Sequence, residues 1–304
     1  MFTLPSQFHT PPPLQPGDRL CVVSTSGSLR ELDSFNQGCE LWRQWGFEVI
    51  VLDAAKAQAG YLAGDDAHRR AALTEAWQDP QVKGILCSRG GYGSARLLEG
   101  WTGFATTAPK WLIGFSDVTG ILWSLAKAGI VGVHGPVLTT VTDEPDWSLT
   151  RLKALLTGQP LPALTGQSWQ GGKAQGRLIV ANLTVATHLL GTPWEPDWQG
   201  VILAIEDVGE APYRIDRMLT QWRLSGALDK PAGIALGRFS GCEAPAGFPS
   251  WTVEEALADR LEGLSIPIVS GLPFGHDGAN AALPVGSWVE LDGDQGMLTI
   301  LPVS

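Results

Sequence analysis

The chain of 304 residues is long for one compact domain and comfortable for two, and 44% hydrophobic with 17% charged residues describes a globular protein. A formal net charge of −10 argues against nucleic acid as a partner, because that binding depends on basic patches. No apolar run reaches the length needed to cross a bilayer. The N-terminus lacks a basic region followed by a hydrophobic core, so we expect neither a secretory signal nor a membrane partner.

Four cysteines are scattered along the chain with no C-x-x-C spacing. Cys21 and Cys87 lie in apolar, strand-like surroundings, where we expect buried free thiols. Cysteine usage of this kind indicates a reducing compartment and no structural metal.

The first half of the chain follows a proline-rich arm over residues 1–16 and alternates strand-like with helix-like segments. The strand patterns cover residues 19–24, 47–52, 82–88 and 111–115, and the helix patterns cover residues 29–45, 65–78 and 94–99. This alternation predicts a parallel, doubly wound sheet of the flavodoxin or Rossmann type. Sites in such sheets form at the carboxyl ends of strands, where Ser24, Arg89 to Gly91 and Ser116 lie.

The second half predicts a separate mixed α/β domain. Strand candidates cover residues 178–181, 201–205, 233–236, 266–269, 288–291 and 297–301, and helix candidates cover residues 182–190, 213–225 and 253–261. Residues 142–172 are a composition shift with few long apolar runs. We therefore assign residues 1–150 to an N-terminal domain, 151–172 to a linker region and 173–304 to a C-terminal domain.

A serine at a strand-to-helix junction is the first candidate for chemistry. The apolar run 111–115 ends at Ser116, and apolar residues follow with helical spacing. Such a turn aims a hydroxyl out of the backbone, and the helix N-terminus offers N–H groups to an oxyanion. The match to G-x-S-x-G is partial, because Val118 stands where the second glycine would be. In the alternative interpretation, Ser116 or Asp117 only caps the helix.

A serine nucleophile needs a base, and the chain holds five histidines. We expect His9 and His68 on the surface, and we expect His188, in an apolar helical stretch, to be hydrogen-bonded and partly buried. His134, at the end of a short apolar run, and His276, in a glycine-rich polar loop after a strand, remain as candidates.

The residue that orients the base should be a carboxylate at the end of a strand. The strand candidate 201–205 leads directly into the acidic segment from Glu206 to Glu210. Acidic groups at the mouth of an apolar strand are costly unless they are paired or functional. The alternative is that they cap the helix that follows.

Taken together, several blocks resemble the LD-carboxypeptidases, also called muramoyltetrapeptide carboxypeptidases. These are serine peptidases with a Ser-Glu-His triad, and the microcin C self-immunity peptidases are their relatives. The resemblance runs from about residue 16 to near the C-terminus and rests on the joint order and spacing of the blocks. They are Pro16-Gly-Asp-Arg-Leu-Cys-Val-Val-Ser24, Arg89-Gly-Gly-Tyr-Gly93, Gly114-Phe-Ser-Asp117, His134-Gly-Pro136, Glu206-Asp-Val-Gly-Glu-Ala-Pro-Tyr-Arg-Ile-Asp-Arg217 and Gly275-His276.

This resemblance implies Ser116 as nucleophile, His276 as base and Glu206 as the carboxylate that orients the base. Glu210 is the fallback for the last role. The triad would join the two domains, with the active site in the cleft between them.

The backbone N–H groups of Gly91 and Asp117 correspond to the oxyanion hole of the family. Arg89 is a candidate partner for a substrate carboxylate, because arginine makes a bidentate fork for such groups. Relatives usually carry Gly-Gly-Asn-Leu where this chain has Val180-Ala-Asn-Leu183. That departure lies outside the three catalytic blocks and concerns the substrate side more than the chemistry.

The implied reaction is acyl transfer to water that releases the terminal D-alanine of a murein tetrapeptide. Its tripeptide product would return to cell-wall synthesis, so the resemblance implies a bacterial cytoplasmic enzyme of peptidoglycan recycling. The family implies no cofactor and no metal, a small peptide substrate and a homodimer.

Three alternatives stay open. The same triad would also suit a peptide–nucleotide antibiotic as substrate, as in the microcin C immunity peptidases. The Arg89 to Gly93 loop would suit a phosphate or nucleotide, although it matches neither G-x-G-x-x-G nor a P-loop with its lysine. A catalytically silent relative would bind murein peptides without cleaving them.

Overall fold

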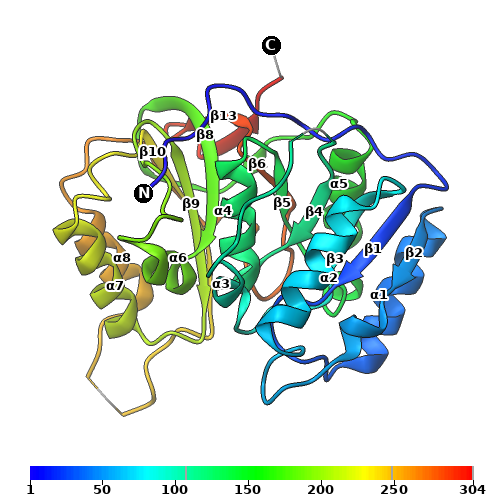
Figure 1. The fold of residues 1–304 in the computed structure, drawn as a ribbon. Coiled ribbons are helices and arrows are strands. Elements are labelled where there is room, and N and C mark those ends of the chain that lie inside the picture. The colour runs from blue at the N-terminus through cyan, green and yellow to red at the C-terminus, as the bar shows by residue number, and fades with distance from the viewer. Residues whose placement is uncertain (107, 248, 303–304) are drawn as a thin grey trace. The chain divides into compact units, whose positions relative to one another are not determined.

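The computed structural model describes residues 1–106, 108–247 and 249–302, which form two compact units (Figure 1). The unit that contains Ser116, called here the serine unit, comprises Phe2–Leu161 and Ala281–Gly286. The unit that contains His276, called here the histidine unit, comprises Met1, Pro162–Asn280 and the described residues from Ser287 onward.

The serine unit is built on a six-stranded sheet with the order β12-β5-β4-β3-β1-β2. Five strands pair in parallel and β12 pairs antiparallel with β5. The parallel order 2-1-3-4-5 is that of the flavodoxin-like doubly wound fold. The strands are β1 (Arg19–Val23), β2 (Glu48–Val51), β3 (Val82–Cys87), β4 (Trp111–Gly114), β5 (Gly132–His134) and β12 (Leu283–Val285).

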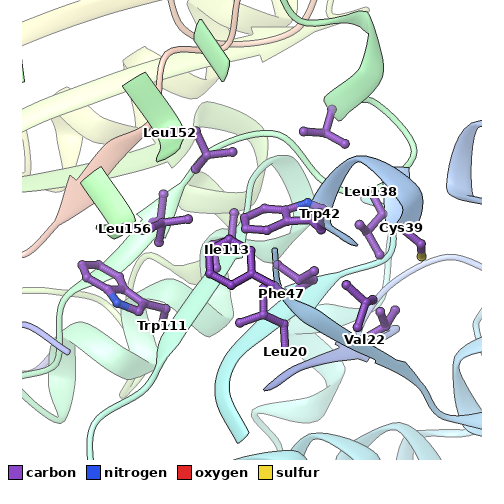
Figure 2. Close-up of a cluster of buried hydrophobic side chains, with 14 of the residues drawn as sticks. Leu20, Val22, Cys39, Trp42, Phe47, Trp111, Ile113, Leu138, Leu152 and Leu156 are labelled. Carbon is purple, nitrogen blue, oxygen red and sulfur yellow. The ribbon is translucent and has the colours of Figure 1, made fainter. Parts of the chain in front are cut away.

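Helices pack on this sheet because their apolar residues recur at helical spacing. In α1, Phe35, Cys39 and Trp42 are buried together, and they join the core cluster drawn in Figure 2 with residues of α5 and the sheet. Helix α3 contacts both α2 and α4, and these three helices supply none of that cluster. The helices are α1 (Leu32–Gln44), α2 (Asp66–Gln78), α3 (Ser94–Leu97), α4 (Thr119–Lys127) and α5 (Asp146–Leu156), with short 3-10 turns η1 (Asp53–Lys56), η2 (Ser116–Val118) and η3 (Val141–Asp143).

The histidine unit is built on an eight-stranded mixed sheet with the order β6-β14-β13-β8-β9-β10-β11-β7. Strands β8 to β11 pair in parallel, and the flanking strands pair antiparallel. The strands are β6 (Leu164–Thr165), β7 (Gln167–Gln170), β8 (Lys173–Asn182), β9 (Ile202–Val208), β10 (Gly233–Ser240), β11 (Ile268–Ser270), β13 (Trp288–Asp292) and β14 (Met297–Ile300).

Three helices accompany this sheet, and their contacts follow chain order: α6 with α7, and α7 with α8 (Figure 1). Helix α8 begins with a capping box, in which Thr252 and Glu255 satisfy each other's backbone N–H groups. The helices are α6 (Leu183–Leu189), α7 (Pro212–Leu224) and α8 (Val253–Leu261).

The predicted fold class is confirmed: a doubly wound parallel sheet comes first and a mixed α/β unit second. All four cysteines are free and buried, as expected for Cys21 and Cys87. No helix in the described parts of the chain is long and apolar enough to cross a membrane.

The boundaries differ from the predicted ones at two points. Residues 151–172, assigned to a linker, contain the end of α5 and two strands of the histidine unit. Leu152 and Leu156 of α5 lie in the serine-unit core. Residues 281–286 return to the serine unit, where β12 extends its sheet. A three-residue strand carries too little periodicity to be recognised in a sequence.

Candidate active site

Ser116 stands at a strained turn between β4 and α4. Its backbone φ is +60°, and Asp277 is the one other non-glycine residue with positive φ in the described chain. A left-handed conformation costs an L-residue about 1–2 kcal/mol, so the surrounding structure must hold it in place. Thr119 donates its hydroxyl proton to the Ser116 carbonyl oxygen at 2.8 Å, and the Val118 N–H donates to Phe115 O at 3.1 Å. The turn is the strand–serine–helix elbow expected from the sequence.

This elbow needs only the first of the two glycines in the G-x-S-x-G pattern. A Cβ at Gly114 would lie 3.0 Å from Val118 Cγ1 and 3.1 Å from the Cys87 sulfur, so a glycine is needed before the serine. Val118 itself is fully buried in the space that Gly114 leaves. Valine in place of the second glycine therefore fits this elbow.

The glycine-rich segment after β3 lies against the serine. A Cβ at Gly90 would lie 3.2 Å from the Cβ and 3.3 Å from the Oγ of Ser116. Gly91 has φ +111°, which few side chains tolerate. The Ser94 N–H donates to Asp117 Oδ2 at 2.8 Å, and the Ser94 hydroxyl donates to the Asp117 carbonyl oxygen. These contacts bring the two segments predicted to form the oxyanion hole to one place.

A buried arginine that the sequence did not reveal supports this loop. Arg69 is 1% exposed and donates to the carbonyl oxygens of Thr25 and Gly93, which follow β1 and β3. Its Nη2 lies 2.6 Å from Asp66 Oδ1. The polar start of α2 looked like a solvated surface in the sequence, so no pattern marked Arg69 as buried.

Arg89 is engaged within the serine unit. Its Nη1 donates to Ser28 O at 2.8 Å, and its Nη2 lies 3.4 Å from a Glu31 carboxylate oxygen. The guanidinium is half-buried beside Gly27, where a Cβ would come within 3.0 Å of it.

In the histidine unit, Glu206 and His276 form a close pair. Glu206, on β9, is 0% exposed, and its Oε2 lies 2.7 Å from His276 Nδ1. Gly275 has φ +116°, and a Cβ there would lie 3.1 Å from Glu206 Oε2. The His276 carbonyl oxygen accepts from Arg238 Nε at 3.3 Å and from the Ser240 hydroxyl, both on β10. The loop is therefore held through both the backbone and the imidazole of His276.

Two further polar residues surround this pair, and sequence reasoning missed their role. The Asn182 side-chain amide donates to Glu206 Oε1 at 3.3 Å and to Asp207 Oδ1 at 2.9 Å. Burial raises the pKa of Asp207, while hydrogen bonds from Thr184, Val208 and Asn182 oppose that rise. The feature of the sequence that could have revealed Asn182 is its place at the junction of an apolar strand and a helix.

The structure places the alternative candidates elsewhere. Glu210 pairs with Arg214 at 3.4 Å, so Glu206 is the glutamate that contacts His276. His134 is fully buried on β5 and packs edge-on against Phe115, with ring centroids 5.8 Å apart.

The remaining histidines lie at the surface. His9 and His68 are exposed, as expected. His188 is exposed too, which corrects the expectation that it is partly buried, although its Nδ1 lies 2.6 Å from Thr184 O. Within the described ranges, no group of three or more His, Cys, Asp or Glu side chains is placed to hold a metal ion.

Comparison with known proteins identifies the family. Models of the LD-carboxypeptidase N-terminal and C-terminal domains match residues 20–135 and 175–291. A Synechocystis protein provisionally named a carboxypeptidase is 66% identical over 99% of this chain and 100% of its own length. The chain belongs to the LD-carboxypeptidase family.

Two further relatives show the range within this family. The crystal structure of muramoyltetrapeptide carboxypeptidase from Oxalobacter formigenes matches with a TM-score of 0.82 at 30% identity, covering 92% of this chain and 97% of that one. The microcin C7 self-immunity protein MccF of Escherichia coli is 26% identical over 95% of this chain and 94% of its own. The resemblance seen in the sequence is confirmed, and the chain is a member of a peptidase family.

Proposed function

We propose that this protein is a serine LD-carboxypeptidase that releases the terminal D-alanine of murein tetrapeptides. The observation that carries the proposal is the pair that the buried Glu206 forms with His276, with 2.7 Å between Oε2 and Nδ1, together with a serine that the other unit displays on a strained elbow. Hydroxyl, imidazole and carboxylate are the three groups of serine acyl-transfer chemistry. The muramoyltetrapeptide relative supports the murein substrate.

In the proposed mechanism, Glu206 accepts a hydrogen bond from the Nδ1–H of His276, which fixes the tautomer and leaves Nε2 as the base. Nε2 takes the Ser116 proton while Oγ bonds to the peptide carbonyl carbon, and the backbone N–H groups of Gly91 and Asp117 stabilise the oxyanion. The imidazolium then protonates the leaving D-alanine amine as the C–N bond breaks. Water hydrolyses the acyl-enzyme by the same steps, and the tripeptide leaves.

The mechanism draws on both units, because Ser116 belongs to the serine unit and the other two groups to the histidine unit. A fluorophosphonate probe tests this requirement directly. The wild type should be labelled at Ser116, and His276→Ala should slow the labelling by at least about 100-fold. Equal labelling rates in both proteins would show that His276 does not activate the serine.

The substrate is tested by measuring D-alanine release from murein tetrapeptide by the wild type and by Ser116→Ala, with a metal chelator in both samples. Release that vanishes in the variant supports a serine LD-carboxypeptidase. Equal release by both proteins would show that Ser116 is not the nucleophile. No release by a folded wild type would contradict the murein assignment.

A second candidate substrate is a peptidyl or aminoacyl nucleotide, favoured by the similarity to MccF across both units. The same triad would cleave it, so the catalytic variants do not separate the two substrates. The ratio of kcat/KM for murein tetrapeptide to that for an aminoacyl-sulfamoyl nucleoside does. We expect the ratio to exceed one, and a ratio well below one would favour the nucleotide substrate.

We also propose a cellular compartment, an oligomeric state and a substrate-binding residue for this enzyme. We place the enzyme in the cytoplasm as a homodimer that returns tripeptide to peptidoglycan recycling; sedimentation of the purified protein tests the dimer. Arg89 is the proposed partner of a substrate carboxylate, although it already bonds Ser28 and Glu31. An Arg89→Ala variant with unchanged kcat/KM would remove that role.

A further inference from the structure

We propose that Asp207 is a positioning residue that acts through Asn182 to hold Glu206 in the orientation that meets His276. The inference rests on the proposed triad and adds to it a residue that never touches the substrate. It is carried by a chain of hydrogen bonds inside the histidine unit.

Strand pairing places Asn182 beside Glu206, and its position at the end of β8 lets the same amide also reach Asp207. Glu206 and Asp207 are consecutive on β9, where successive side chains point to opposite faces of the sheet. Asn182 is paired directly with Glu206 at the end of the parallel strand β8, and it is also the N-cap of α6. From this position its amide nitrogen lies 3.3 Å from Glu206 Oε1 and 2.9 Å from Asp207 Oδ1.

The orientation of the Asn182 amide is over-determined. Its Oδ1 accepts the Val185 N–H at 3.1 Å, so the two protons on Nδ2 face the carboxylates of Glu206 and Asp207. An amide turned the other way would place its oxygen against two acceptors and its NH2 against a donor. Asp207 thus helps to keep an N–H donor in front of Glu206.

Asp207 is itself fixed as an acceptor. Its Oδ2 accepts from the Thr184 N–H at 2.9 Å and from the Thr184 hydroxyl at 2.8 Å, and its Oδ1 also accepts the Val208 N–H at 2.8 Å. Each of these neighbours is a donor, so an asparagine here would turn its NH2 toward at least one of them. Asp207→Asn therefore changes hydrogen bonding while keeping the side-chain shape.

The consequence falls on Glu206. With Oε1 satisfied by Asn182, Oε2 is directed at His276 Nδ1. Without the Asn182 donor, the buried Oε1 of Glu206 loses this hydrogen bond. Rotation of the Glu206 side chain toward another donor then becomes favourable. Small misplacements of catalytic groups reduce turnover strongly. We therefore expect loss of the hydrogen bond from Asn182 to Glu206 to lower kcat rather than to raise KM.

The first test compares Asp207→Asn, Asn182→Ala and the double variant. Asp207→Asn should lower kcat by about 10- to 100-fold with KM changed less than about twofold. The double variant should be no slower than Asn182→Ala, because one residue acts through the other. Losses that multiply would show that Asp207 acts independently of Asn182.

A matched control is Asp292→Asn, the same substitution at another buried aspartate of this unit, which pairs with Lys173 at 2.7 Å. It should lower stability without lowering kcat. Equal kcat values for the Asp207 and Asp292 variants would overturn the proposal. If Asp207→Asn does not fold, Thr184→Val removes one donor to Asp207 and should give a smaller loss of kcat in the same direction.

The second test needs no substrate and so separates this proposal from the proposed function. In protein labelled with nitrogen-15 in histidine, the wild type should show His276 protonated at Nδ1, assigned by comparison with His276→Gln. Asp207→Asn should broaden or shift that signal, and Asp292→Asn should leave it unchanged. An unchanged signal in Asp207→Asn would overturn the proposal, even if murein peptides prove not to be substrates.

Discussion

The two units display their functional groups by different physical means. In the serine unit the backbone does the positioning: Ser116 has φ +60°, and glycines beside it leave room that a Cβ would fill. In the histidine unit side-chain hydrogen bonds add to the positive φ of Gly275: Asn182 and His276 each hydrogen-bond the buried Glu206. A nucleophile must protrude from its backbone, whereas a base needs a fixed tautomer, so the first depends on conformation and the second on hydrogen bonds.

The largest expected effect is at the displayed hydroxyl. Ser116→Ala should lower kcat by at least about 10⁴-fold, because the nucleophile is lost while the remaining groups persist. Circular dichroism and thermal melting should show a folded protein with an unchanged melting temperature, since alanine keeps the Cβ. A variant that retained a tenth of the wild-type rate would mean that the elbow only caps α4.

The next effect is at the side-chain pair. Glu206→Gln should lower kcat by about 10³- to 10⁴-fold, because an amide NH2 facing Nδ1 favours the wrong imidazole tautomer. Glu210→Gln is the matched control: its pair with Arg214 is exposed, so kcat should change less than about twofold. If the two variants exchanged these outcomes, Glu210 would be the triad acid.

A backbone change in the serine unit should have a smaller effect. Gly91→Ala forces a side chain into φ +111° and should shift the loop, lowering kcat by about 100-fold as an oxyanion donor moves away. Gly17→Ala is the control, since Gly17 has φ +89°, also beyond the ordinary left-handed region, but nothing lies within 4 Å of its Cβ position. The control variant should introduce similar backbone strain and leave kcat unchanged. Equal kcat in both variants would exclude the Gly91 N–H from the oxyanion hole.

The smallest effect concerns the cysteines, which lie in both units. Burial raises the pKa of Cys87 to about 12 and those of Cys21 and Cys242 to about 11, so these groups stay thiols below that range. Ellman's reagent at pH 8 should therefore leave the folded protein unmodified and fully active. Rapid reaction of a native thiol with loss of D-alanine release would point to a cysteine near the chemistry.

Much of the fold could be read from local patterns. The strand at 82–88 and the helix at 253–261 depend on residues close in the chain, and the structure reproduces both within one residue or so at their ends. The same holds for the elbow at Ser116, which needs one strand, one turn and one helix. The prediction of a linker was wrong because β6 and β7 are short strands whose partners lie about a hundred residues or more away in the chain.

The sequence by itself determined the candidate residues for the chemistry: a hydroxyl after β4, carboxylates after the apolar part of β9 and a histidine in a glycine-rich loop. Only the tertiary structure shows that Glu206 and not Glu210 contacts His276, because that contact joins residues 70 positions apart. It also decided that Asn182 and Arg69 are buried partners of the site rather than solvated polar groups. Periodicity reports which face of an element is apolar, whereas hydrogen bonds between elements depend on strand order and register, which no local pattern encodes.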